Sequence, residues 1–119
     1  MAFKFENLEI WKDSNQFVKN IYKITKKFPR DELFALTDQL RRSASSISAN
    51  IAEGSGSSSK KDFTHYLDIS IKSIYETVSH LYLAKDQGYL LEKDLLSLYN
   101  KAEVLVKRIQ AFKSWLKRS

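Results

Sequence analysis

The sequence predicts an all-α protein, an antiparallel up-down-up-down four-helix bundle that forms a single domain over residues 1–119. Three observations favour this fold. Apolar residues recur every three or four positions in four long segments, and no segment alternates apolar and polar residues as a strand does. The chain holds only three Gly and one Pro, and they fall between these segments. Because the connections are short, consecutive helices are expected to lie side by side and antiparallel.

Each predicted helix is bounded by residues that favour helix ends. Pro29 closes the first segment, Gly54 and Gly56 close the second, and Gly88 follows the third at a position typical of helix C-termini. Ser59, with an acid three residues later, is a typical N-cap for the third helix. The expected helices run from Asn7 to Lys27, from Asp31 to Glu53, from Lys60 to Asp86 and from Glu92 to Leu116.

The helices differ in the width of their apolar faces. The second and fourth carry narrow stripes suited to one shared core, whereas the first and third carry broader apolar arcs. A second subunit would cover the excess, so we expect a homo-oligomer whose diagonal helices meet head to tail, a contact that can close into a ring. The alternative is that large side chains overlap the bundle edge. The candidate interface residues are Ile10, Phe17, Ile24, Ile71, Tyr75 and Tyr82.

Composition narrows the function classes. The formal net charge is +6, which permits an anionic partner, and the absence of Cys excludes disulfides and thiolate metal sites. The N-terminal segment carries charges where a signal peptide needs an apolar run, and no apolar run is long enough to span a bilayer. We therefore expect a cytoplasmic protein with no membrane partner and no small-molecule substrate.

Residues 41–63, RRSASSISANIAEGSGSSSKKDF, are unusually polar for a helical protein. They fit a phosphate-binding loop, a tight packing surface or a flexible linker. The loop is not a Walker A phosphate-binding loop, because it lacks that pattern and follows a helix instead of a strand. Its Ser and Lys residues lie at the start of the third helix, where free backbone N–H groups attract anions. The alternative to such an anion site is an ordinary capped turn.

Small residues let a neighbouring backbone approach, so the longer polar side chains beside them would be enclosed and need partners. We favour a buried polar network that fixes helix register, and the alternative is a polar pocket. The expected members of the network are Gln39, Arg42, Asn50, Glu53, Ser73 and Glu76.

Two basic runs are candidate nucleic-acid contacts. The segments 14–30 and 104–119 contain cations and no acid, and the second includes Trp115, an aromatic platform on which a base can stack. The alternative is that these cations complement the dipoles of helix C-termini. The candidate residues are Lys19, Lys23, Lys26, Lys27, Arg30, Lys60, Lys61, Lys113, Lys117 and Arg118.

The sequence does not favour an enzyme. His65 and His80 are separated by about 22 Å along one helix, so they cannot share a site within a subunit. Asp62 and His65 resemble half of a di-iron motif, but the second copy and the further glutamates are missing. We therefore expect no catalytic residue, no metal and no cofactor.

The segment QLRRSASSISANIAEGSGSSSKKDF resembles bacterial four-helix-bundle proteins encoded in intervening sequences of 23S ribosomal RNA genes. The opening Leu8–Trp11 and the pair Phe28-Pro29 are similar too. The residues that carry the resemblance are Gln39, Arg41, Arg42, Ser46, Ile47, Asn50, Ile51, Ala52, Glu53, Gly54, Asp62, Phe63, Ser73 and Glu76.

This resemblance implies a bundle that assembles as a homopentameric ring. The related accessory variability proteins of diversity-generating retroelements look similar and bind RNA through basic surface. The sequence departs from the family pattern at two positions. Ser57 stands where the family usually carries an Arg, and Lys72 stands where it often carries a Gly. We expect a non-enzymatic, ring-forming protein that associates with RNA or another nucleic acid. The alternative function is a protein–protein adaptor or assembly scaffold.

Overall fold

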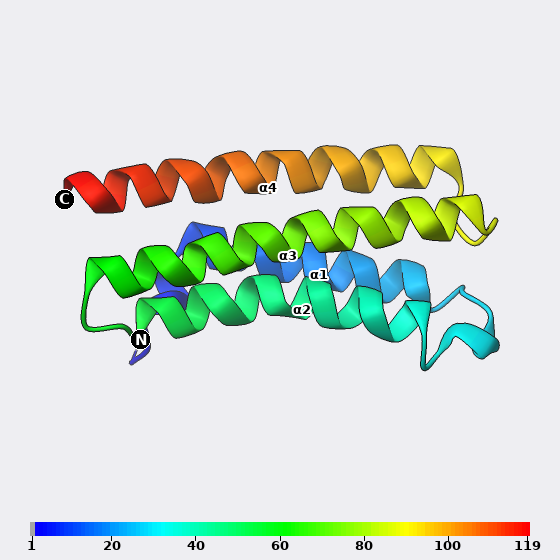
Figure 1. Cartoon of the computed structure of the whole chain (residues 1–119), viewed down its shortest axis with the longest axis horizontal. Coiled ribbons are helices and arrows are strands. Elements are labelled where there is room, and N and C mark those ends of the chain that lie inside the picture. Colours follow the sequence, from blue (N-terminus) through cyan, green and yellow to red (C-terminus); the bar gives the residue numbers. More distant parts are fainter. Residues whose placement is uncertain (1) are drawn as a thin grey trace.

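A computed structural model describes residues 2–119 as four long helices joined by short loops (Figure 1). The helices are α1 (Glu9–Thr25), α2 (Leu36–Ser55), α3 (Lys60–Asp86) and α4 (Glu92–Arg118). Short 3-10 helices, Lys4–Asn7 and Arg30–Glu32, precede α1 and α2. No strand occurs in the described part of the chain, so the predicted all-α class is confirmed.

Successive helices run in opposite directions, and the bundle measures 46 × 23 × 21 Å. α1 and α3 each pack against both α2 and α4, whereas the backbones of the two diagonal pairs stay farther apart within residues 2–119. This arrangement confirms the predicted up-down-up-down topology. We call the end with both chain termini and the α2–α3 loop the terminal end, and the other end the distal end (Figure 1).

The core is built from branched aliphatic side chains on the inward face of each helix. Burial of such side chains removes apolar surface from water and is the main force that holds the bundle together. None of the most deeply buried residues is a large aromatic. The largest fully buried apolar side chains are Ile21, Leu40, Ile47, Ile51, Leu67, Ile74, Leu81 and Ile109.

Most predicted helix ends agree with the structure, but the start of α2 does not. α2 begins at Leu36 and not at Asp31, because the chain forms a 3-10 turn first. The Glu32 carboxylate accepts a hydrogen bond from the Leu36 backbone N–H at 3.3 Å and another from the Tyr89 hydroxyl at 2.9 Å. Glu32 thus ties this turn to the α3–α4 connection, a tertiary contact that propensity along the chain does not contain.

The other boundaries follow local chemistry. The Ser59 hydroxyl accepts a hydrogen bond from the Asp62 N–H at 3.1 Å, so Ser59 is the N-cap of α3 as predicted. Gly88 has φ +81°, the left-handed conformation that glycine adopts most easily after a helix. Gly54 differs from the prediction, because it lies inside α2 and is buried.

Small hydroxyl side chains join α2 to α3. We call Ser43, Ser46, Ser70, Ser73 and Thr77 the hydroxyl seam. Thr77 Oγ1 donates to Ser43 Oγ at 2.8 Å, and Ser73 Oγ donates to Ser46 Oγ at 2.9 Å. Ser70 Oγ donates across the same interface to the backbone carbonyl of Ile47 at 2.9 Å. These bonds satisfy polar groups that close packing removes from water.

Gly54 extends this close packing to the terminal end. A Cβ atom at Gly54 would lie 2.7 Å from Tyr66 Cβ and 2.8 Å from Phe63 Cδ1 on α3. Real Cβ atoms do not approach other atoms this closely, so a side chain here would push the two helices apart. The small residues of segment 41–63 therefore form a packing surface.

α4 is held in a different way. Beyond its core residues, Arg108 pairs with Asp13 of α1 at 2.6 Å, and Lys113 pairs with Asp68 of α3 at 2.5 Å. Hollows lie along both flanks of α4, one facing α1 and the other facing α3. No helix in residues 2–119 is long and apolar enough to cross a membrane.

Candidate nucleic-acid interface

The basic residues of α1 lie on the surface. All five candidates of this run are exposed, and within the described chain none of them forms an ion pair: Lys19, Lys23, Lys26, Lys27 and Arg30. They continue from the middle of α1 to the distal end, because α1 runs in that direction (Figure 1). Their positive charges are therefore available to a ligand.

Two of these lysines face a groove between α1 and α4. Lys23 lines it from α1, Lys27 from the turn that follows α1, and Lys101 from α4, and its volume is about 310 Å³. Asp94 is the one acidic residue among those that line it in the described chain. We call this hollow the basic groove, and its lining residues are Asn20, Lys23, Ile24, Lys27, Asp94, Ser97, Leu98 and Lys101.

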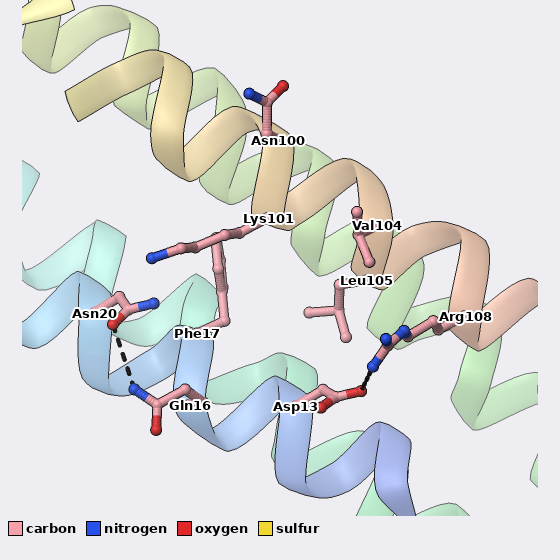
Figure 2. Close-up of a pocket in the computed structure, with 9 residues that line it drawn as sticks. All are labelled: Asp13, Gln16, Phe17, Asn20, Asn100, Lys101, Val104, Leu105 and Arg108. Atoms are coloured by element: carbon pink, nitrogen blue, oxygen red, sulfur yellow. Dashed lines mark hydrogen bonds and ion pairs between the residues drawn. The ribbon is translucent and has the colours of Figure 1, made fainter. Parts of the chain in front are cut away.

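The groove continues along the same two helices toward the terminal end. Asn20 and Lys101 line both parts, and the second part has a volume of about 440 Å³ (Figure 2). Its floor includes the buried side chains of Phe17 and Leu105, while Arg108 stands at its far margin. An apolar floor with amide and cationic groups along the rim can receive a base and hold a phosphate beside it.

The polar rim of this second part is partly satisfied already. The Gln16 side-chain amide donates to Asn20 Oδ1 at 3.4 Å, and Arg108 is held by Asp13 (Figure 2). Lys101 has no such partner within residues 2–119. Of the cations that line the two parts, Lys23, Lys27 and Lys101 are therefore the free ones.

The second basic group lies at the terminal end, as predicted from the topology. Lys60, Lys61, Lys117 and Arg118 are exposed, and none of the four has an ion-pair partner in the described chain. Lys113 differs, because its ammonium group is engaged by Asp68. This lysine contributes to the attachment of α4 more than to a free cationic surface.

The expected polar network needs correction. Four of its six predicted members are exposed in the single chain: Gln39, Arg42, Glu53 and Glu76. Arg42 pairs with Asp38 one turn earlier, and Glu76 pairs with His80 on its own helix. The long polar side chains project outward from positions beside the small ones, so the hydroxyl seam takes the buried positions.

The remaining two members do make hydrogen bonds at the α2–α3 interface. Asn50 Nδ2 donates to the Ser46 carbonyl at 2.8 Å and to Ser46 Oγ at 2.9 Å, while Ser73 is buried in the seam. Ser43, Ser70 and Thr77 were missed, although their spacing along α2 and α3 is a detectable signal. Hydroxyls at intervals of three or four residues on an otherwise apolar face suggest a polar contact between two helices.

Two of the predicted interface residues are also wrongly placed. Ile10 and Phe17 are buried in the core of the single chain, since α1 packs against both α2 and α4 and uses most of its apolar arc. Ile24 and Ile71 are half-buried. Tyr75 and Tyr82 on α3 are exposed, to 67% and 48%, so they are available to a partner.

Lys101 is the functional candidate that the sequence did not indicate. It stands alone among acidic and polar neighbours in α4, far along the chain from Lys23 and Lys27. Only the antiparallel packing of α4 on α1 brings the three lysines together. If α1 and α4 are assumed to be neighbours, the residues on their facing sides can be compared, and this comparison would place Lys101 near Lys23.

The described residues contain no cluster of three or more His, Cys, Asp or Glu side chains placed to hold a metal ion. The hydrogen bond from the Tyr89 hydroxyl to Glu32 raises the pKa of that hydroxyl. This tyrosine joins two loops at the distal end and lines none of the hollows described above.

Comparisons with known proteins identify the family. A solved structure from Bacteroides thetaiotaomicron VPI-5482, described as a protein of unknown function from the S23 ribosomal protein family, is 27% identical in sequence. The match covers 87% of this chain and 97% of that chain, with a TM-score of 0.80. The comparison with curated proteins found no similar sequence. Residues 6–111 match the 23S rRNA-intervening sequence protein family, so the chain belongs to that family.

Proposed function

We propose that this protein is a non-enzymatic RNA-associating protein that contacts the RNA backbone through the basic groove. The observation that carries the proposal is the convergence of Lys23, Lys27 and Lys101 from two helices on one hollow lined by a single acid. Lysine ammonium groups attract phosphates as point charges, and they carry little information about base identity. We therefore expect binding that depends strongly on salt and weakly on sequence.

A charge-reversal experiment tests this proposal. The double variant Lys23→Glu/Lys101→Glu places two negative charges in the basic groove. The matched control is Lys72→Glu/Lys85→Glu, which changes the net charge equally but lies on α3, outside every hollow described above. We expect the groove variant to lose most of its RNA affinity in a low-salt gel shift. We also expect its logarithmic salt dependence to fall by about one per lost lysine contact.

The control should retain the affinity of the wild type, apart from a small general loss from reduced charge. Equal losses in the two double variants would mean that only the net charge matters, and the groove assignment would be wrong. Failure of the wild type to bind RNA at all would favour the adaptor function.

We also propose that the protein assembles as a ring of identical subunits, with five as the number that the family resemblance implies. A hollow of about 340 Å³ between α3 and α4, lined mainly by apolar and aromatic residues together with Glu103, Lys107 and Gln110, supports self-association. Val78 and Val106 line it, and the exposed rings of Tyr75 and Tyr99 flank it. Such a surface on a soluble chain is typical of a protein contact. A ring would repeat the basic groove around its circumference and raise RNA avidity without new contacts.

Light scattering tests the assembly. The variant Tyr75→Glu/Val106→Glu places charges in the α3–α4 hollow and should shift an oligomeric wild type to the monomer with an unchanged helical circular dichroism spectrum. Phe34→Glu is the control, because Phe34 is a fully exposed aromatic in the α1–α2 connection. A monomeric wild type at micromolar concentration would contradict the proposal, and so would an oligomer that survives the double change.

A further inference from the structure

The terminal end of the bundle carries an aromatic arrangement that the basic groove does not use. Trp115 on α4 packs on Phe112 with ring centroids 5.5 Å apart, and Phe112 packs on Phe63 of α3, also at 5.5 Å. We call these three residues the aromatic ladder. The two inner rings are half-buried, whereas Trp115 remains 54% exposed. The ladder therefore holds a large aromatic ring in place while it leaves much of that ring open to solvent.

The charges around this ring are of one sign along α4. Residues 104–119 contain no acid, and of their cations only Arg108 and Lys113 are engaged in ion pairs. Lys117 and Arg118 follow Trp115 by two and three residues and form no ion pair within the described chain. Lys60 and Lys61 lie at the same end of the bundle. The exposed acids near this end are Glu9 on α1 and Asp62 on α3, which both pack against α4, and Glu53 on the diagonal α2. Between residues 104 and 118, the charged side chains of α4 are all cationic.

Together these features match an unpaired nucleotide. A base stacks on a fixed, half-exposed indole through its flat face, while neighbouring cations neutralise the adjoining phosphates. Base pairs inside a duplex cannot do this, because their faces are covered by the neighbouring pairs. An apolar protein partner could pack on the indole ring but would not neutralise the free cations around it. Charge complementarity therefore favours a single-stranded polyanion as the ligand.

We propose that Trp115 and its flanking cations form a site for single-stranded RNA, distinct from the basic groove and selective for unpaired bases. The inference rests on the proposed RNA-associating function and adds its substrate class. The basic groove supplies affinity for any RNA backbone. The aromatic ladder at the terminal end supplies the preference for a strand with exposed bases.

The test compares a short fluorescein-labelled oligoadenylate with a blunt RNA duplex of the same length, each titrated at one fixed salt concentration. Trp115→Ala should weaken oligoadenylate binding by about 5- to 150-fold, the effect of losing one stacked base, and leave duplex binding unchanged. Trp115→Phe keeps an aromatic face and should recover most of the loss. Phe34→Ala is the matched control, since it removes another exposed aromatic at the distal end and should change neither affinity.

A spectroscopic reading makes the test direct. The chain has two tryptophans, so Trp115 is the single tryptophan of the variant Trp11→Phe. Oligoadenylate should quench its tryptophan fluorescence, whereas the duplex should not. Equal effects of Trp115→Ala on both RNAs, or no quenching in Trp11→Phe, would overturn this inference and leave the proposed function intact. Absence of RNA binding by the wild type would overturn both.

Discussion

The α2–α3 interface and the flanks of α4 are two different solutions to helix packing in one small bundle. Across α2 and α3, hydroxyl side chains and Gly54 bring the backbones close, and hydrogen bonds cross the interface. α4 instead carries hollows on both flanks and is tied to its neighbours by two partly exposed ion pairs, Arg108–Asp13 beside the α1 hollow and Lys113–Asp68 toward α3. The comparison teaches that the most polar stretch of the sequence, residues 41–63, forms the closest helix–helix packing. The amphipathic helix α4 packs less closely and leaves hollows that a ligand can enter.

The largest effect should come from Gly54. Gly54→Val places side-chain atoms where even a Cβ would meet Tyr66 and Phe63, so we expect a loss of about 2–3 kcal/mol in the free energy of unfolding. Urea denaturation followed by circular dichroism measures this. Gly56→Ala is the control, because the nearest atom to its Cβ is the Glu53 carbonyl oxygen at 3.5 Å. A Gly54→Val protein as stable as the wild type would mean that α2 and α3 are not packed this closely.

A smaller loss should follow from removal of one hydroxyl from the seam. Thr77→Val keeps the side-chain shape but removes the hydrogen bonds from Thr77 Oγ1 to Ser43 Oγ and to the Ser73 carbonyl. Ser43 keeps its bond to the Leu40 carbonyl, so we expect a loss of about 1 kcal/mol in the free energy of unfolding. Ser79→Ala is the control on the same helix, since Ser79 is exposed. If thermal melting shows equal stabilities for both variants, the hydroxyls fill space without supporting the interface.

The smallest effect should come from an ion pair of α4. Arg108 and Asp13 are both partly exposed, and pairs of this kind contribute about 0–1 kcal/mol, less at high salt. A double-mutant cycle of Arg108→Gln and Asp13→Asn should give a coupling free energy in this range. A value above that of the Thr77→Val change would reverse the comparison, because α4 would then depend on its ion pairs more than α2 and α3 depend on their hydroxyls.

The sequence was sufficient for the fold but only in part for the surfaces. The helix ends at Gly88 and Ser59, like the apolar periodicity, depend only on neighbours along the chain, so the sequence was enough to predict them. The start of α2 could not, because Glu32 is fixed by Tyr89 from a distant loop. Phe17 was assigned to an interface because apolar arcs show width but not which neighbouring helix covers them.

The candidate site shows the same division. Lys23 and Lys27 belong to a visible basic run, and their exposure follows from the amphipathic pattern of α1. Lys101 joins them only through the packing of α4, so no feature of its own segment marks it. Glu53 and Arg42 were expected inside because they adjoin small residues, yet long charged side chains are cheaper to leave in water than to bury.

Hydrogen–deuterium exchange with and without RNA tests the central claim, that the rigid α2–α3 interface supports a separate binding surface between α1 and α4. We expect the slowest exchange in α2 and in residues 67–84 of α3, with no change there on adding RNA, because their interface is tightly packed and hydrogen-bonded. Residues 20–27 and 94–101 should exchange more slowly once RNA occupies the basic groove. Exchange in α4 as slow as in α3, or RNA protection that falls on α2 and α3 while residues 20–27 and 94–101 are unchanged, would contradict the account.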